Sequence, residues 1–208
     1  ASSIAEALDW TAEVYRAAGA LLASKGRLRG VADEGGYWPE FSQNEEAIEL
    51  VVDAIKAAGL KPGKQVAISL DIAATQLYRD GLYRFEGGVL PAARFAEVLL
   101  DWIDAYPICA IEDPLAEDDT EGMARFTESA RRRALVIGDD FLVTNAARVA
   151  AAAKAGACTA ALIKPNQAGT LTEAKAAFAA ARQAGWATIV SARSGETEDV
   201  TIAHLAVG

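Results

Sequence analysis

Residues 135–164 read LVIGDDFLVTNAARVAAAAKAGACTAALIK, and this stretch indicates the fold. Two short apolar runs, 135–137 and 160–163, enclose an alanine-rich segment of high helix propensity. Both runs are apolar throughout, which is typical of strands that are covered on both faces. Parallel strands need a crossover connection, and a helix is the usual one. The stretch therefore predicts a parallel βα unit.

The same pattern occurs on both sides of this unit. Further short apolar or β-branched runs lie at 66–70, 108–111 and 188–190, which brings the number of predicted strands to five. Residues 29–36 could add an irregular strand. The strict alternation of these runs with helical segments favours an α/β fold.

Three Ser/Thr-x-x-Glu sequences predict helix starts, because the hydroxyl and the carboxylate satisfy N–H groups that the first turn leaves unpaired. They begin at Ser3, Ser42 and Thr170. A fourth helix is expected to begin at Pro91, since proline suits the first turn of a helix.

Composition excludes several classes of protein. The chain has 208 residues, 52% of them hydrophobic, which suffices for a sizeable core. Its net charge of −9 makes nucleic acid a poor partner. The single histidine, His204, is expected to be partly buried and non-catalytic, which disfavours histidine-based zinc sites. No apolar run is long enough to span a membrane, so we expect a cytoplasmic protein without a membrane partner.

Polar residues follow the predicted strands. Asp71, Glu112 and Lys164 come directly after three of them, Asp139 follows a fourth after one glycine, and Arg193 lies just beyond the fifth. The carboxyl ends of parallel strands meet on one face, so these side chains should gather there. Three uncompensated carboxylates would repel one another, and a bound divalent cation removes that repulsion. Oxygen ligands favour Mg²⁺ or Mn²⁺ over Zn²⁺.

Simpler interpretations stay open for each residue. A single aspartate after a strand is more often a helix N-cap or a turn residue than a metal ligand. Lys164 could be a general base, because desolvation and a nearby metal favour its neutral amine. The simpler alternative is an ion pair with Glu112 or Asp139.

Two further segments could contact a ligand. Residues 33–36 read DEGG and place Glu34 on a loop whose glycines allow close approach, although an ordinary acidic turn has the same sequence. Arg193 and Ser194 have the donors to hold a phosphate or a carboxylate. A lone arginine is otherwise most often part of a surface ion pair.

Seven blocks of the sequence, in this order, resemble the signature sequences of the enolase family. They are 33–36 (DEGG), 70–71 (LD), 111–119 (IEDPLAEDD), 138–145 (GDDFLVTN), 163–167 (IKPNQ), 169–173 (GTLTE) and 193–199 (RSGETED). The resemblance implies an enolase-type TIM barrel, (β/α)8, that is incomplete in this chain. It further implies a homodimer or a higher homo-oligomer.

The resemblance also implies a Mg²⁺-dependent enzyme that removes the proton α to a carboxylate and then expels a β-hydroxide, taking 2-phosphoglycerate to phosphoenolpyruvate. Its substrate is a small phosphorylated hydroxy acid. The roles implied by position are metal binding for Asp71, Glu112 and Asp139, substrate contact for Glu112, Arg193 and Ser194, abstraction of the C2 proton for Lys164, and assistance to the leaving hydroxyl for Glu34.

Departures from the family pattern leave two alternatives open. Ala192 stands where enolases carry a histidine, and Tyr37 and Trp38 replace Phe-Ala after the double glycine. Ala192 and Trp38 would border the substrate. The first alternative is an enolase-like paralogue of phosphonate or phosphinate natural-product biosynthesis that transfers a phosphonoformyl group to a phosphoglycerate. The second is a catalytically silent enolase-like scaffold.

Residues 1–208 correspond to part of the family's C-terminal barrel domain. The N-terminal α+β domain, the first two barrel strands and the last strand of the family have no counterpart in the sequence. Five or six strands cannot close an eight-stranded barrel. We therefore expect these residues to be part of a longer polypeptide.

Overall fold

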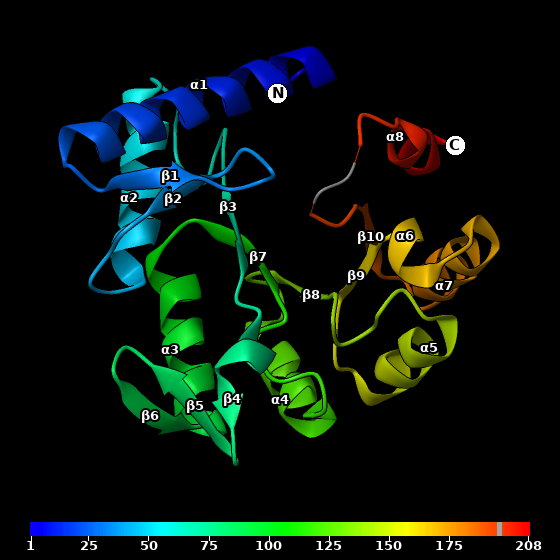
Figure 1. The fold of residues 1–208 in the computed structure, drawn as a ribbon. Coiled ribbons are helices and arrows are strands. Elements are labelled where there is room, and N and C mark those ends of the chain that lie inside the picture. Colours follow the sequence, from blue (N-terminus) through cyan, green and yellow to red (C-terminus); the bar gives the residue numbers. More distant parts are fainter. Residues whose placement is uncertain (195–196) are drawn as a thin grey trace. The chain divides into compact units, whose positions relative to one another are not determined.

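A five-stranded sheet with the order β10-β9-β8-β7-β3 organises the structure (Figure 1). The computed structural model describes residues 1–194 and 197–208. The pairs β7–β8, β8–β9 and β9–β10 are parallel. All five predicted strands are present and confirm the α/β class. Their bounds are Ile68–Asp71 (β3), Ile108–Glu112 (β7), Leu135–Gly138 (β8), Ala160–Ile163 (β9) and Ala187–Val190 (β10).

The burial of β8 and β9 explains why their sequences are apolar throughout. Every residue of β9 is buried, as are the last three residues of β8. Edge strand β10 instead alternates between exposed and half-buried positions. Five strands do not close an eight-stranded barrel, so the predicted barrel is incomplete in this chain.

Helices follow the strands, as expected. They are α3 (Ala92–Ala105), α4 (Thr120–Ala130), α5 (Ala146–Ala155), α6 (Pro165–Ala168), α7 (Leu171–Gln183) and α8 (Thr201–Val207). Helix α3 begins directly after Pro91, and α7 has Thr170 as its N-cap, which confirms two predicted starts. In the described residues, no helix has the length and apolar character that crossing a membrane would require.

The chain divides into two compact units. The first comprises Ala1–Ile68 and Asp104–Cys109, and the second comprises Ser69–Ile103 and Ala110–Gly208. In the first unit, α1 (Ile4–Ser24) packs on α2 (Glu45–Ala57), and β1 (Leu28–Val31) pairs with β2 (Tyr37–Pro39) as an antiparallel hairpin.

The start of α2 differs from the expectation. The helix begins at Glu45 with Asn44 as its N-cap, so the prediction of Ser42 as the cap is wrong. Glu46 accepts hydrogen bonds from the backbone N–H groups of Ser42 and Gln43, at 3.1 and 3.2 Å. These bonds hold the preceding segment in a turn. The predicted cap at Ser3 is present, since its hydroxyl accepts the N–H of Glu6.

Two tyrosines hold the β1–β2 loop in place. The rings of Tyr15 and Tyr37 stack with centroids 4.3 Å apart, and the Tyr15 hydroxyl donates to the carbonyl of Gly35 at 2.7 Å. Tyr37 lies so close to Gly19 that a Cβ there would be 2.2 Å from its hydroxyl oxygen. The irregular strand expected at 29–36 is therefore the short strand β1 followed by a loop that the two tyrosines hold in place.

An antiparallel meander in the second unit was not predicted. It follows the 3-10 turn η1 (Ala74–Leu77) and consists of β4 (Tyr78–Arg79), β5 (Leu82–Phe85) and β6 (Gly88–Pro91). The residues between β4 and β5 are Asp80 and Gly81, both with positive φ, as the favoured two-residue hairpin turns require. The Asp-Gly pair was the available signal, but the strands on either side are too short to show a period.

Tyr83 joins this meander to the rest of its unit. Its side chain is fully buried, and its ring stacks on Phe95 of α3 with centroids 4.5 Å apart. The backbone N–H of Ala116, in the segment after β7, donates to the Tyr83 hydroxyl at 2.8 Å. One side chain thus fills the core and satisfies a buried N–H group.

Replacing Tyr83 by phenylalanine tests this description. The variant keeps the ring but leaves the Ala116 N–H without its partner, so we expect the free energy of unfolding to fall by about 1–3 kcal/mol. Urea denaturation followed by circular dichroism measures the change. Tyr78→Phe, in the half-buried ring next to Tyr83, is the matched control and should change the free energy by less than about 0.5 kcal/mol. Equal losses in both variants would contradict the assignment.

Candidate functional site

Four predicted site residues lie at strand ends in the second unit. Asp71 and Glu112 are the last residues of β3 and β7, and Asp139 and Lys164 directly follow β8 and β9. Because neighbouring strands β7, β8 and β9 are parallel, their carboxyl ends lie along one edge of the sheet. The strand ends thus bring acidic and basic groups from separate parts of the chain to one place.

Lys164 and Asp139 form a largely buried ion pair. The lysine Nζ donates to Oδ2 of Asp139, and the two side chains are only 14% and 10% exposed. This is the ion-pair alternative that the sequence left open for Lys164. A buried pair of this kind is held together because neither charge has water to compensate it. The position of Nζ is therefore well defined.

Thr144 fixes the backbone beside this pair. The N–H of Lys164 donates to the Thr144 hydroxyl oxygen at 3.0 Å, and that hydroxyl donates to Oε1 of Gln167 at 2.6 Å. Nε2 of Gln167 lies 3.5 Å from Oδ1 of Asp139. Thr144 is buried and adopts a left-handed backbone, with φ of 50°, which is uncommon outside glycine. Sequence reasoning gave Thr144 and Gln167 no role.

The carboxylates at this edge repel one another. Burial of Glu112, followed by the negative charges of Asp71 and Asp139, raises the pKa of its carboxyl to about 8. Asp71 is exposed overall, yet desolvation of its carboxyl raises the pKa and the charge of Asp139 adds to the shift. Lys164 only partly opposes these effects. The site therefore has more negative charge than its own residues neutralise, as a cation-binding site would.

A second grouping of acids includes Asp139. Among the described residues, Asp113, Asp139 and Asp140 each offer a carboxylate oxygen, and these atoms all lie within 4.8 Å of one another. Such all-oxygen donor sets suit hard divalent cations. This group shares only Asp139 with the predicted ligands Asp71, Glu112 and Asp139, which stay a prediction. Asp113 was not expected to contribute.

The remaining predicted residues lie elsewhere. Glu34 is in the β1–β2 loop of the first unit, and its role stays a prediction. Arg193 and Ser194 are exposed on the segment after β10, whose start is tied to β9 by the bond from Ser191 N–H to Ile163 O at 2.9 Å. Residues 195 and 196 of that block lie outside the described residues.

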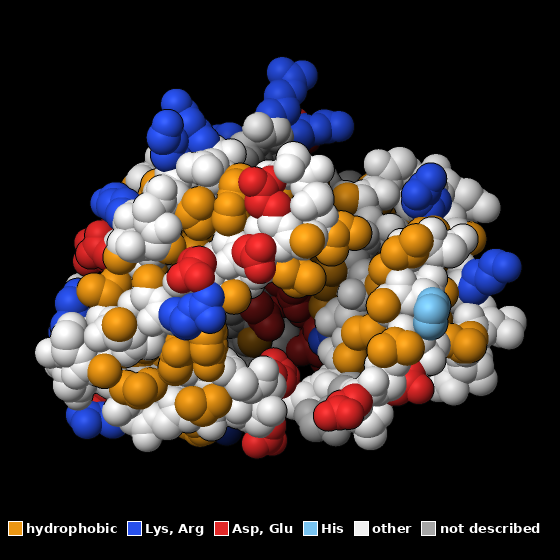
Figure 2. Space-filling view, turned by 90° about the horizontal axis from the view of Figure 1, so that it is seen from above, with side chains coloured by type: hydrophobic (Ala, Val, Ile, Leu, Met, Phe, Trp, Pro, Cys, Tyr) orange, Lys and Arg blue, Asp and Glu red, His pale blue; other side chains and the backbone are white. Residues whose placement is uncertain are grey.

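The expected partial burial of His204 is wrong. The side chain is exposed on α8, and Figure 2 shows it in pale blue at the surface. Helix α8 is a seven-residue helix without a buried residue, so an apolar neighbourhood in sequence does not become an apolar environment here.

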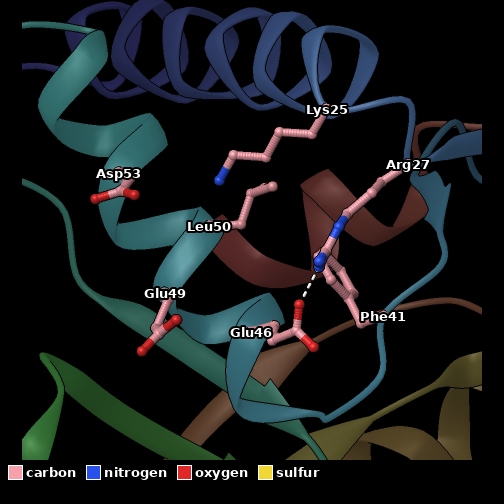
Figure 3. Close-up of a pocket in the computed structure, with 7 residues that line it drawn as sticks. All are labelled: Lys25, Arg27, Phe41, Glu46, Glu49, Leu50 and Asp53. Atoms are coloured by element: carbon pink, nitrogen blue, oxygen red, sulfur yellow. Dashed lines mark hydrogen bonds and ion pairs between the residues drawn. The ribbon is translucent and has the colours of Figure 1, made fainter.

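Two pockets have linings that include neither Lys164 nor Asp139. A cavity of about 160 Å³ borders Ala192, Pro165 and Asn166. In the first unit, a cavity of about 410 Å³ is lined by both acidic and basic side chains (Figure 3). There Arg27 forms an ion pair with Glu46 and lies 5.3 Å from the centre of the Phe41 ring. That pocket contains none of the predicted site residues.

The family comparison agrees with this arrangement. A family model described as the enolase C-terminal TIM barrel domain matches residues 1–208, the whole of the chain. The parallel strands and the acidic residues at their carboxyl ends are what such a barrel would present. The chain therefore belongs to the enolase family, as its C-terminal TIM barrel domain.

Proposed function

We propose that this domain carries the proton-abstraction site of a Mg²⁺-dependent enzyme that converts 2-phosphoglycerate to phosphoenolpyruvate by removing the α-proton and eliminating water. The observation that carries the proposal is the buried contact between Lys164 and Asp139 beside Glu112, whose pKa is raised to about 8. The amine of Lys164 would supply the base, and the neighbouring carboxylates would supply the ligands for a cation. Membership of the enolase family supports this class of enzyme.

The carboxylates suit a hard divalent cation. Asp71, Glu112 and Asp139 offer only oxygen ligands, and burial and mutual repulsion of the acids raise the pKa of Glu112 and that of Asp71. When bound, Mg²⁺ stabilises the negative charge that develops on the substrate carboxylate as the α-proton leaves. Glu112, the last residue of β7, would also contact the substrate.

Lys164 is the base in this proposal. Its backbone is held by Thr144 and its side chain is 14% exposed, so Nζ has little freedom to move. The ammonium that pairs with Asp139 would first have to give up a proton, after which the lone pair of the neutral amine would take the proton from C2. The ammonium that results is balanced by Asp139, which already accepts its hydrogen bond. Restricted motion and a waiting counter-charge both favour proton transfer.

Three residues complete the proposal by their position in the family pattern. Glu34 would assist departure of the β-hydroxyl, and Arg193 with Ser194 would hold the phosphate. Arginine suits that task because its planar fork can donate two parallel hydrogen bonds to phosphate oxygens. Arg193 and Ser194 are exposed, so both are accessible to an anion from solution.

Ala192 favours a second candidate function. Its small side chain borders a cavity of about 160 Å³. Space at that position suits a different leaving group or a second substrate, as in phosphonoformyl transfer to a phosphoglycerate. The enzyme would then keep the cation and Lys164 but form another product.

Product analysis tests the proposed function. We expect 2-phosphoglycerate with Mg²⁺ to give phosphoenolpyruvate, seen as a rise in ultraviolet absorbance and by ³¹P nuclear magnetic resonance. Omission of Mg²⁺ should abolish the signal. Binding of phosphoglycerate without any phosphoenolpyruvate would reject dehydration and favour group transfer. If calorimetry detects neither Mg²⁺ nor phosphoglycerate binding, the scaffold alternative holds.

Lys164→Ala should stop exchange of the α-proton. The variant lacks the base, so we expect exchange of the substrate C2 proton with solvent deuterium to fall at least about 100-fold, with Mg²⁺ affinity retained. Proton nuclear magnetic resonance in deuterium oxide measures the exchange. Lys154→Ala, in the last turn of α5, is the control and should exchange at the normal rate. Unchanged exchange in Lys164→Ala would remove Lys164 from this role.

The affinity for Mg²⁺ should rise with pH. The pKa of Glu112 is raised from 4.5 to about 8, so its protonation stabilises the metal-free fold fully below pH 4.5. That contribution is lost as the pH rises through about 8. A cation competes with the proton, so the increase in Tm on adding Mg²⁺ should be larger at about pH 8.5, above the shifted pKa, than at about pH 6, well below it.

Two variants make this measurement specific. Glu112→Gln has no carboxylate to titrate and should lose most of the pH dependence of the Tm increase. Asp101→Asn, at an exposed position of α3, should behave like the unmodified protein. A Tm increase of the same size at both pH values would show that Glu112 does not compete with protons for the ion.

A further inference from the structure

Asp113 is a buried acid to which the proposed chemistry gives no task. It follows Glu112 at the end of β7, and its residue is only 4% exposed. Its φ of 40° lies in the left-handed region, which is uncommon for a residue with a Cβ. A buried charge on a strained backbone is costly, so the contacts of Asp113 should explain it.

The backbone of Asp113 joins three strand ends. Its N–H donates to the carbonyl of Ile137 in β8 at 3.0 Å. Its carbonyl accepts the N–H of Ala74, in the segment after β3, at 3.2 Å. The residue itself belongs to the end of β7. It therefore links the strand ends that carry Asp71, Glu112 and Asp139.

The carboxylate of Asp113 accepts two hydrogen bonds from the end of β8. Oδ1 accepts the backbone N–H of Asp139 at 3.0 Å, and Oδ2 accepts the N–H of Asp140 at 2.7 Å. Both oxygens of one carboxylate thus hold two successive peptide groups. Bonds from an ionised acceptor are stronger than neutral ones, and two of them fix direction as well as distance. The chain leaves β8 in an orientation that Asp113 sets.

We propose that Asp113 is a positioning residue that acts through Asp139. Its carboxylate holds the Asp139 backbone so that the Asp139 side chain meets Lys164 and stays available to the cation. This inference rests on the proposed function, in which Asp139 is a metal ligand. Residues that orient a ligand without binding the ion themselves commonly change metal affinity 10–100-fold.

The geometry requires a carboxylate at this position. Asparagine has nearly the same shape, but it offers one acceptor and one NH₂ donor to two N–H donors. One of the two peptide groups would then face another donor and lose its partner. The backbone bonds of Asp113 to Ile137 and Ala74 do not depend on the side chain, so Asp113→Asn disturbs the end of β8 selectively.

The closeness of Asp113 to Asp139 and Asp140 also fits direct metal ligation. A double-mutant cycle separates the two roles. If Asp113 acts through Asp139, adding Asp113→Asn to Asp139→Asn should not weaken Mg²⁺ binding further. If Asp113 binds the ion independently, the two losses should multiply.

The experiment is calorimetric titration of the protein with Mg²⁺, below the Tm of each variant. We expect Asp113→Asn to raise the Kd about 10–100-fold and the double variant to match Asp139→Asn. Asp119→Ala removes the N-cap bond to Gly122 in α4 and is the control for lost stability, with an unchanged Kd. Should Asp113→Asn fail to fold, Asp113→Glu takes its place, because it keeps both acceptors on a longer stem that displaces Asp139.

Three outcomes would overturn the inference. A normal Kd for the folded Asp113 variant would reduce Asp113 to a structural role, and multiplied losses in the double variant would make it a ligand. If Asp113→Glu has to be used instead of Asp113→Asn, an unchanged Kd for Mg²⁺ in Asp113→Glu would likewise reduce Asp113 to a structural role. The proposed function fails separately, if the unmodified protein binds no Mg²⁺ or if Asp139→Asn binds it normally.

Discussion

Repulsion among the carboxylates at the strand ends is the constraint on which the site depends. The parallel sheet fixes where β7, β8 and β9 end, so the acidic residues there cannot move apart. Burial, followed by the charges of Asp71 and Asp139, raises the pKa of Glu112. Lys164 offsets part of the charge through Asp139 and leaves the rest for a ligand to neutralise. The sheet thus holds the carboxylates close enough to repel one another, and a bound cation would relieve that repulsion.

Buried and half-buried polar residues after the strand ends keep these groups in register. Thr144 receives the backbone N–H of Lys164, and Gln167 bridges from Thr144 toward Asp139. The carboxylate of Asp113 accepts the backbone N–H of Asp139. Each contact joins loops that follow different strands. A network of this kind is strong only when every member is satisfied, so it defines one arrangement of the site rather than several.

Sequence alone predicted the sheet and the strand-end residues, because an apolar run that ends in a charged residue is a local pattern. It missed the β4–β5–β6 meander, whose strands are too short to show a period, and it misplaced the start of α2, where Asn44 is the cap instead of Ser42. The contacts of Asp113 and Thr144 join residues 26 and 20 positions apart. No local pattern records such contacts, because they exist only after the strands have been brought together.

Val143 and Thr144 adopt a left-handed backbone, where a substitution by glycine would normally be favourable. Conformational preference alone would favour glycine at both positions, since their φ values are 45° and 50°. Glycine at 144 would relax the backbone and at the same time delete the hydroxyl that receives the Lys164 N–H. Glycine at position 144 would therefore suit the backbone conformation but would remove a hydrogen bond that the site needs. Variation among natural homologues should be more permissive toward glycine at 143 than at 144.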